Sequence, residues 1–421
     1  MLKLKNVTKG AKETIGTIRL KNDFGRNKLP NLKVAIIGAG ISGLSAALLL
    51  KQLKCDVTVF EKNKYIKNEG AGIQITSNGS FVLKKLGLDK PIIRAGIKPN
   101  NLCLFDEDDF KCIGSLEILE RLKGRYGRSF ITLNRSLLVK ILFEKVKQEK
   151  IQVKFGSRAL PIVGKDEKNI SISFNGKKIN KDLIVVADGV GSSWKKTIFR
   201  EIKNRSISQC AYRFVLNNKK LPAIFSENNI NLFFGRGRHF VTYPTGNNGM
   251  INFVFCKRES GKMINDWKEK VSKQQFLNDF EIDEALKICL PDMKNIYRWP
   301  VIESEIPITM QKKNVVMVGD AAHGMLPYMA QGANKALEDS WELSKCIKEF
   351  PLDLSKGLSR YSKKRIRRIR QLDKVSHFNE KVYHLEQKTL RRIFFVFLRL
   401  ITIFSPNFFF KRLDWIYKHE G

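Results

Sequence analysis

The segment Val34–Lys62, which reads VAIIGAGISGLSAALLLKQLKCDVTVFEK, decides the fold. Two short apolar runs rich in Val and Ile flank a glycine-rich turn and an apolar run of helix length. This order indicates a β-strand, an α-helix and a second, parallel strand. The segment therefore predicts a βαβ unit and favours the α/β class for the chain.

The glycines of this turn form a GxGxxG pattern at Gly38, Gly40 and Gly43. Residues without side chains permit a tight turn and let a pyrophosphate approach the N–H groups at the start of the helix. Glu61 ends the second strand, 18 residues after Gly43, where a carboxylate accepts hydrogen bonds from ribose hydroxyls. The combination predicts a dinucleotide site, but it does not by itself separate FAD from NAD.

The rest of the chain predicts a second sheet and a helical end. Apolar runs at Leu183–Ala187 and Val315–Val318 each precede an Asp-Gly or Gly-Asp turn, as parallel strands do at a ligand site. Alternating runs between about residues 200 and 300 predict an antiparallel sheet, and the sequence after Ser355 is helical. The expected fold is a Rossmann-like binding domain with a parallel sheet, an antiparallel-sheet substrate domain and C-terminal helices. The expected segments are a basic N-terminal extension at 1–32, the first part of the binding domain at 33–198, the substrate domain at 199–299, the second part of the binding domain at 300–370 and a C-terminal helical region at 371–421.

The composition limits the classes of function. The 421 residues carry a formal net charge of +36, but lysines are scattered along the chain. The basic run KKRIRRIR at 363–370 has no interleaved aromatic residues, so nucleic-acid binding is not expected. Seven cysteines occur without a CxxC pair, and the N-terminus lacks an apolar signal sequence. We therefore expect neither a metal site nor a disulfide framework, and a cytoplasmic location.

The segment Val315–Ser344, VVMVGDAAHGMLPYMAQGANKALEDSWELS, separates FAD from NAD. It resembles the second FAD motif of the group A FAD-dependent aromatic monooxygenases, in particular enzymes like salicylate hydroxylase and 3-hydroxybenzoate 6-hydroxylase, which have the para-hydroxybenzoate hydroxylase fold. The resemblance implies that Asp320 binds the ribityl hydroxyls of FAD. It also implies that the backbone of Gly332, Ala333 and Asn334 faces the pyrimidine edge of the flavin, where the positive end of a helix stabilises a reduced, negatively charged ring.

Three other segments resemble the same family. EGAGIQITSNGSFVLKKLGL at 69–88 implies that Gly72 and Ile73 border the flavin. ITLNRSLLVKIL at 131–142 implies that Arg135 reaches FAD, and DLIVVADGVGSSWKKTIF at 182–199 implies that Asp188 lies near the pyrophosphate. The last segment departs from the family pattern, because Val186 replaces a common Gly, and Gly191 and Lys195 replace the usual arginines. The surface that meets the nicotinamide cofactor is therefore the least defined part of the site.

His239 and Tyr243 are the candidate catalytic residues. They lie four residues apart in HFVTYP, so on a strand both side chains point to one face. The resemblance implies that the histidine contacts the substrate hydroxyl and that the tyrosine lines the same pocket. The alternative for His239 is a strand-end histidine satisfied by backbone groups. Arg236 and Arg238 precede it, either as partners of a substrate carboxylate or as a solvated edge.

The resemblance implies an enzyme that uses NADH or NADPH, O2 and FAD to hydroxylate a phenolic, hydroxybenzoate-like ring through a flavin hydroperoxide. Two alternatives remain open: a ring hydroxylase of a lipid-linked quinone precursor, and a flavoprotein that does not hydroxylate. The apolar stretch Ile393–Phe404 is too short to span a membrane, and basic residues flank it. Such a helix is compatible with peripheral contact at the inner face of the membrane.

Overall fold

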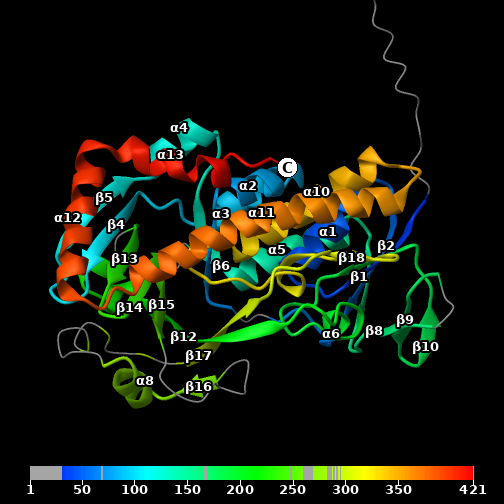
Figure 1. Ribbon diagram of the computed structural model, residues 1–421, viewed down its shortest axis with the longest axis horizontal. Helices are drawn as coiled ribbons and strands as arrows, with labels where there is room; N and C mark the ends of the chain where they lie inside the picture. Colours follow the sequence, from blue (N-terminus) through cyan, green and yellow to red (C-terminus); the bar gives the residue numbers. More distant parts are fainter. Residues whose placement is uncertain are drawn as a thin grey trace, which may run out of the picture.

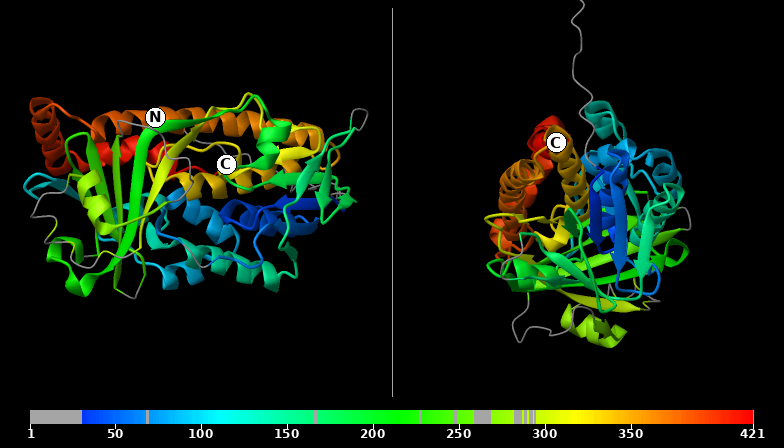
Figure 2. Two further views of the ribbon diagram at one scale, coloured as in Figure 1. Left: turned by 90° about the horizontal axis from the view of Figure 1, so that it is seen from below. Right: turned by 90° about the vertical axis from the view of Figure 1, so that its right-hand side faces the viewer.

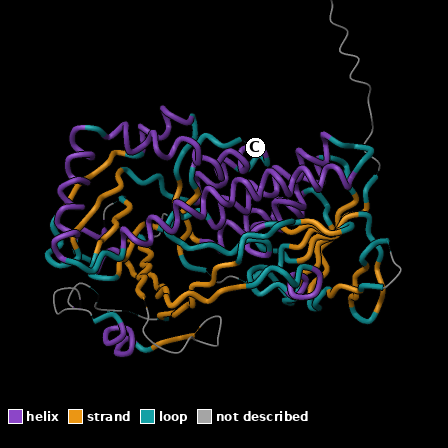
Figure 3. Tube along the Cα trace, in the orientation of Figure 1, coloured by secondary structure: helices purple, strands orange, loops and turns teal. Residues whose placement is uncertain are grey.

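The structure is a computed structural model that describes residues 31–67, 70–164, 168–226, 228–246, 249–258, 269–281, 287, 290, 293 and 295–420. The predicted N-terminal extension, residues 1–32, lies outside the described residues apart from its last two. Two sheets occupy opposite ends of the long axis, and helices run over both (Figures 1 and 3).

The first sheet has six strands in the order β18-β19-β11-β1-β2-β7. All neighbouring pairs are parallel except β18 with β19. Its central strands are fully buried because helices cover the sheet, which explains their continuous Val and Ile runs. The strands are β1 (Lys33–Ile37), β2 (Asp56–Glu61), β7 (Gln152–Phe155), β11 (Leu183–Val186), β18 (Gln311–Lys312) and β19 (Val315–Met317).

The helices of this half pack around the predicted βαβ unit. α1 (Ile41–Gln52) is buried on nearly all sides, because the sheet, α5 and α10 enclose it. The other helices are α2 (Ser77–Lys85), α3 (Asp89–Ala95), α5 (Arg135–Gln148), α6 (Ser193–Ile198), the 3-10 turn η2 (Gly319–Ala321) and α10 (Gly332–Glu349). A small third sheet lies at the end of the molecule away from the second sheet (Figure 1). It consists of β8 (Leu160–Ile162), β9 (Ser171–Phe174) and β10 (Lys177–Ile179).

The second sheet has eight strands in the order β16-β17-β12-β15-β14-β13-β4-β5. One face carries an aromatic cluster against which Phe276 and Phe280 pack. The opposite face, called here the site face, carries His239 and Tyr243. The strands are β4 (Asn101–Asp106), β5 (Cys112–Glu117), β12 (Asn204–Asn217), β13 (Ile230–Phe234), β14 (Arg238–Pro244), β15 (Met250–Arg258), β16 (Glu269–Val271) and β17 (Ile296–Ser304), with η1 (Asn218–Lys220), α7 (Ala223–Ser226) and α8 (Lys273–Asp279) beside them.

A two-stranded ribbon joins the two halves. β3 (Gly72–Ile75) pairs with β6 (Ile131–Asn134), and both strands contact the site face of the second sheet. Because β3 also contacts α10, the ribbon lies between the first half of the molecule and the second sheet.

The C-terminal helices connect the two halves from outside. α11 (Leu354–Tyr383) packs on α10 and then runs along much of the molecule to the second sheet, as Figure 1 and the left view of Figure 2 show. α12 (Lys388–Phe404) covers β5, and α13 (Pro406–Tyr417) returns to α2. The Arg125–Asp414 ion pair ties α13 to α4 (Leu119–Tyr126).

Two predicted boundaries differ from this arrangement. β4 and β5 belong to the second sheet although they lie in the segment 33–198, because β4 pairs in parallel with β13 and extends that sheet. The boundary at residue 370 falls inside α11, a continuous helix of 30 residues. Beyond Gly357 this helix contains neither Gly nor Pro to interrupt it.

Candidate active site

The glycine-rich turn has the predicted place between β1 and α1, and its glycines have different tasks. Gly38 has φ of +104°, and a Cβ there would lie 2.6 Å from the carbonyl oxygen of Ala187. A Cβ at Gly43 would lie 1.9 Å from the carbonyl oxygen of Gly38. At Gly40 a Cβ would meet nothing within 4 Å. Two glycines therefore permit close backbone packing, whereas the third leaves open space for a ligand.

Glu61 ends β2 beside this turn, as predicted. Its Oε2 accepts a hydrogen bond from the N–H of Ala39 at 2.9 Å, and its Oε1 accepts one from the N–H of Asn63 at 2.9 Å. The carboxylate is buried and holds the turn in place. The structure therefore gives Glu61 a supporting role within the turn, in the position expected for a ribose contact.

Asp188 and Asp320 lie at the carboxyl ends of the adjacent strands β11 and β19. Asp188 Oδ2 accepts from the N–H of Ser193 at 3.2 Å, while its Oδ1 is buried without a partner. Burial raises the pKa of this carboxyl above its usual value. Gly189, the next residue, has φ of +82° and open space beside it. Asp320 is 55% exposed and lies 3.6 Å from Lys335 Nζ.

Arg135 begins α5, as predicted, and its side chain is exposed. Enough protein surrounds the guanidinium that desolvation lowers its pKa. The charge of Asp320 opposes this shift, and the charge of Arg213 adds to it. Arg135, Asp320 and Arg213 are therefore close enough to interact electrostatically across the two halves of the molecule.

The start of α10 faces the ribbon. Gly332 is exposed with open space beside it, and the first N–H groups of a helix lack intrahelical acceptors. Asn334 is fully buried: its Oδ1 accepts from the N–H of Thr76 at 3.0 Å, and its Nδ2 donates to the carbonyl of Gln74 at 3.0 Å. The prediction gave Asn334 a backbone role at the flavin, and Ala333 lies beside it in the same turn. The structure adds that the Asn334 side chain fixes α10 to β3.

The ribbon comes close to the site face at Gly72. A Cβ at Gly72 would lie 2.6 Å from Cε2 of Tyr243 and 2.7 Å from Cβ of Asn252. The N–H of Gly72 donates to Asn252 Oδ1 at 2.7 Å, and Asn252 Nδ2 is buried without a partner. The predicted residues Gly72 and Tyr243 therefore meet here, whereas Ile73, the next residue of β3, packs against the apolar core of the first half. Sequence reasoning missed Asn252, which shows its role only through this contact.

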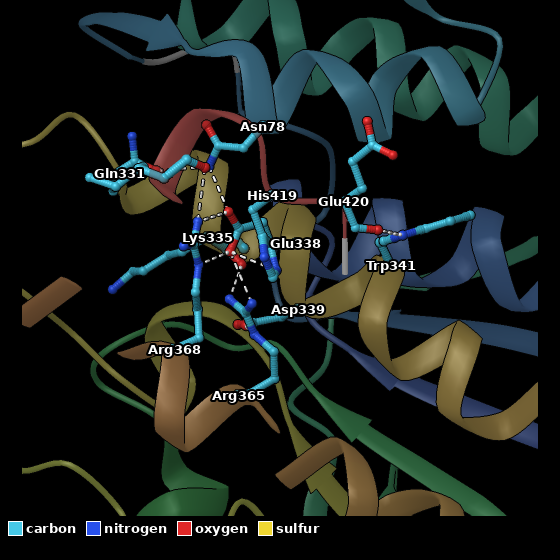
Figure 4. Close-up of polar contacts among 12 residues, drawn as sticks. Asn78, Gln331, Lys335, Glu338, Asp339, Trp341, Arg365, Arg368, His419 and Glu420 are labelled. Atoms are coloured by element: carbon cyan, nitrogen blue, oxygen red, sulfur yellow. Dashed lines mark hydrogen bonds and ion pairs between the residues drawn. The ribbon is translucent and has the colours of Figure 1, made fainter. Parts of the chain in front are cut away.

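A buried charge network supports the start of α10 from behind (Figure 4). Arg365 Nε donates to Asp339 at 2.6 Å, and Arg365 and Arg368 donate to Glu338 at 2.9 and 2.8 Å. Burial alone would raise the pKa of Glu338, but the two guanidinium groups lower it to about 2. Asn78 Nδ2 donates to Glu338 at 2.6 Å and thereby connects α2. Both arginines come from the basic run KKRIRRIR at 363–370.

His239 lies on the site face but pairs with a second histidine. Its Nδ1 is 2.9 Å from Nε2 of His384 at the end of α11, and the rings of Tyr328 and Tyr383 pack around it. Burial, and then the neighbouring His384, hold the pKa of His239 well below its usual value. Tyr243 shares the face, as expected, and contacts the ribbon. The histidine is therefore neither exposed nor satisfied by backbone groups.

The two arginines before His239 do not join this arrangement. Arg238 Nε donates to Glu107 at 2.9 Å, and the same guanidinium donates to the carbonyl of Phe280. Arg236 is exposed in the turn between β13 and β14. The structure therefore assigns Arg238 to an ion pair away from the ribbon and Arg236 to the surface.

Residues 31–376 match the family described as FAD binding domain. The chain belongs to this FAD-binding family. Among its curated relatives is 3-hydroxybenzoate 6-hydroxylase 1 of Aquipseudomonas alcaligenes, 26% identical over 396 residues that cover 92% of this chain and 98% of the relative. Another is 3-amino-4-hydroxybenzoate 2-monooxygenase of Streptomyces cremeus, 25% identical with 84% and 88% covered. The predicted family, enzyme class and FAD cofactor are thereby confirmed.

Solved structures of this FAD-binding fold are similar to the chain over most of its length. HpxO of Klebsiella pneumoniae in complex with FAD and uric acid has a TM-score of 0.78 at 20% identity, with 94% of this chain and 99% of that one covered. A salicylate hydroxylase substrate complex has a TM-score of 0.74 at 20% identity, with 93% and 96% covered. The predicted fold class is confirmed.

The residues of the site fit FAD. Gly40, Gly189 and Gly332 each have open space where a side chain would otherwise project. Asp188 has a buried oxygen without a partner, and Asp320 and Arg135 expose charged groups that interact with each other. Hydroxyl groups suit the carboxylates, and an anionic group suits the arginine and the start of α1.

Proposed function

We propose that the chain is an FAD-dependent monooxygenase that uses NADH or NADPH and O2 to hydroxylate a small phenolic compound of the hydroxybenzoate type. The observation that carries the proposal is that the segment from Gly72 to Thr76 touches both parts of the site: Gly72 meets Tyr243 on the site face, and Asn334 of α10 bonds Gln74 and Thr76. Substrate preferences in the names of the two relatives support a benzoate derivative.

The chain's own residues would bind and orient the cofactor and the substrate, and they would accept and donate protons. FAD, when bound, supplies the electron transfer from the nicotinamide cofactor and the activation of O2. The N–H groups at the start of α10 stabilise negative charge on the group they face. His239 is the proposed acceptor of the phenol proton, because it lies on the same face of β14 as Tyr243 and its Nδ1 is 2.9 Å from Nε2 of His384.

Aerobic oxidation of NADH and NADPH by the FAD-loaded protein tests the proposal, with hydroxybenzoates and lipophilic phenols as substrates and products identified by mass spectrometry. We expect oxidation to rise with one hydroxybenzoate and its product to gain one oxygen atom. The variant His239→Asn should retain FAD but hydroxylate roughly 100-fold or more slowly. Product from lipophilic phenols alone would favour the lipid-linked alternative. Bound FAD without stimulation by any compound would favour a flavoprotein that does not hydroxylate.

The outer face of α12 supports a second proposal, peripheral contact with an anionic membrane surface. No described helix alone is long and apolar enough to cross a bilayer, and α12 with α13 passes that test only as a pair bent by 93°. α12 stands at one end of the molecule (Figure 1), contains no acidic residue, and exposes Arg392 and Arg399. The outer face is lined by Leu390, Ile393, Val396, Phe397, Leu400, Ile403 and Phe404, which are 48–75% exposed.

A helix with exposed apolar and basic side chains binds anionic lipid by burying the first and neutralising the second. We propose a location in the cytoplasm at the inner membrane face, where described cysteines that form no disulfide with one another are usual. Co-sedimentation with phosphatidylcholine vesicles, with and without phosphatidylglycerol, tests the contact. We expect binding to the anionic vesicles that weakens with salt and is lost in Leu400→Ser/Ile403→Ser. A dimer in sedimentation equilibrium without vesicle binding would instead assign the face to a second copy.

A further inference from the structure

The basic run of α11 contains an outward set of cations that the proposed function does not use. Lys363, Arg367 and Arg370 are exposed. They follow one another at spacings of four and three residues, so they lie on one face of the helix. None of the three forms an ion pair or a hydrogen bond with another residue that the structure describes. This outward set therefore presents three free positive charges to the surroundings.

Other cations of the same stretch of α11 have anionic partners. Arg360, Lys364, Arg365 and Arg368 each contact a carboxylate of α10, at distances between 2.5 and 3.1 Å. The outward set instead places three like charges on adjacent turns. Like charges three or four residues apart destabilise a helix, because they repel each other. An anion from outside the chain would remove this repulsion.

The outward set lines a hollow in the surface, called here the basic hollow. Its volume is about 400 Å³, and its lining residues are Ile308, Lys363, Ile366, Arg367, Arg370 and Gln371. Ile366 is 7% exposed, whereas Ile308 is 86% exposed. The loop that carries Ile308 is fixed to α11, because the N–H of Met310 donates to Ser362 Oγ at 2.8 Å. The basic hollow therefore combines three cations with apolar surface on ordered elements.

The chemistry of the basic hollow suits carboxylates beside an apolar side chain. A guanidinium offers paired N–H donors that match the two oxygens of a carboxylate, and Ile308 offers apolar contact. None of the six lining residues is aromatic, so the hollow has no platform on which a nucleic-acid base could stack. The three cations span about 10 Å along the helix axis, which is the length of a few residues of a peptide.

We propose that the basic hollow binds a short acidic segment of a partner protein, with an apolar side chain of that segment against Ile308. The carboxylates of the segment would contact the outward set of cations, as acidic motifs do with arginine clusters. The proposal goes beyond the proposed function, because it requires neither an aromatic substrate nor a nicotinamide cofactor. A protein that fails to hydroxylate can therefore still bind the segment, and the reverse also holds.

Fluorescence anisotropy tests the proposal, with a labelled peptide of Glu-Glu-Leu repeats titrated with the FAD-loaded protein at physiological salt. Arg367→Glu/Arg370→Glu should weaken binding at least roughly 10-fold, because repulsion replaces two charge-assisted contacts. Arg367→Lys/Arg370→Lys should weaken it by roughly 3-fold, because lysine keeps the charge but not the paired donors. Ile308→Ser should weaken it by roughly 3- to 10-fold, but should hardly affect a peptide in which serine replaces leucine.

Lys140→Glu/Arg236→Glu is the matched control, because it makes the same change of net charge at two exposed cations outside the basic hollow. It should bind the peptide like the wild type, and retained FAD shows that each variant is folded. Equal weakening by the two double Glu variants would overturn the proposal, since net charge alone would explain binding. So would no binding of the peptide by the wild type. Tighter binding of a single-stranded oligonucleotide of equal charge, lost in Arg367→Glu/Arg370→Glu, would also overturn it.

Discussion

α11 buries arginines, whereas α12 exposes large apolar side chains. In α11, Arg365 is 1% exposed, and in α12 Phe404 is 75% exposed. The difference follows from the neighbours of each helix: α11 lies against the carboxylates of α10, whereas α12 packs against β5 and α13 and leaves its outer face exposed. The residue types of a helix therefore do not decide which face is buried. The chemistry of the adjoining element decides it.

Removing the buried cation of α11 should have the largest effect on stability. Arg365→Leu leaves Asp339 without its guanidinium partner and removes one of the two guanidinium groups, those of Arg365 and Arg368, that contact Glu338. Loss of one partner of a buried ion pair typically costs about 3–5 kcal/mol, because the remaining charge is buried and uncompensated. Urea denaturation of the FAD-loaded protein measures the free energy of unfolding.

Arg360→Leu is the control on the same helix, since Arg360 and Glu349 form an exposed pair. Exposed ion pairs contribute about 0–1 kcal/mol, so this variant should unfold close to the wild type. Equal losses of stability in the two variants would mean that the buried ion pairs of Arg365 contribute no more to stability than the exposed ion pair of Arg360.

The sequence predicted the parts of the site that depend on local backbone. Gly38, Gly40 and Gly43 lie where β1 turns into α1, and a GxGxxG pattern between two apolar runs predicts that turn. The place of the Asp residues after β11 and β19 could be predicted in the same way, because the carboxyl ends of parallel strands meet at one edge of a sheet. These features need only a short window of sequence.

The parts that the sequence did not predict depend on distant contacts. Arg213 is one of 77 Lys and Arg residues, and its place beside Val254 and Val241 on the site face appears only when β12, β15 and β14 align. The helical spacing of Ile366 and Ile369 in the basic run of α11 predicts that both side chains point inward, and both are buried. It did not reveal the two buried arginines, because their partners lie on α10, about thirty residues earlier.

His384, at the end of α11, should make the free energy of unfolding depend on pH, with a smaller effect than the loss of Arg365. Burial lowers the pKa of His384 to about 4, and the charge of Arg258 contributes. The unfolded chain protonates this histidine near its usual value, so it binds more protons than the folded chain between those values. The unfolding free energy should therefore fall as pH drops from about 6.5 to about 4, by up to roughly 3 kcal/mol for this group.

His384→Gln should flatten that pH dependence, measured by urea unfolding at three pH values in this window. His377, on the same helix, acts in the opposite direction: desolvation lowers its pKa, but Glu380, Glu303 and Asp373 raise it overall. Its stabilising effect is present at low pH and is lost as pH rises through its folded pKa. An unchanged slope in His384→Gln would show that other groups, not this buried histidine, set the acid sensitivity.

The smallest effect is expected on the outer face of α12. Leu400 is 50% exposed, whereas Leu398, two residues earlier, is 8% exposed. Leu400→Ser should change the unfolding free energy by less than about 0.5 kcal/mol, while Leu398→Ala should cost roughly 2–5 kcal/mol through a cavity against β4 and β5. Urea denaturation at low protein concentration, without lipid, compares them. Similar costs would mean that the outer face is covered in the free protein, and the contrast between α11 and α12 would then vanish.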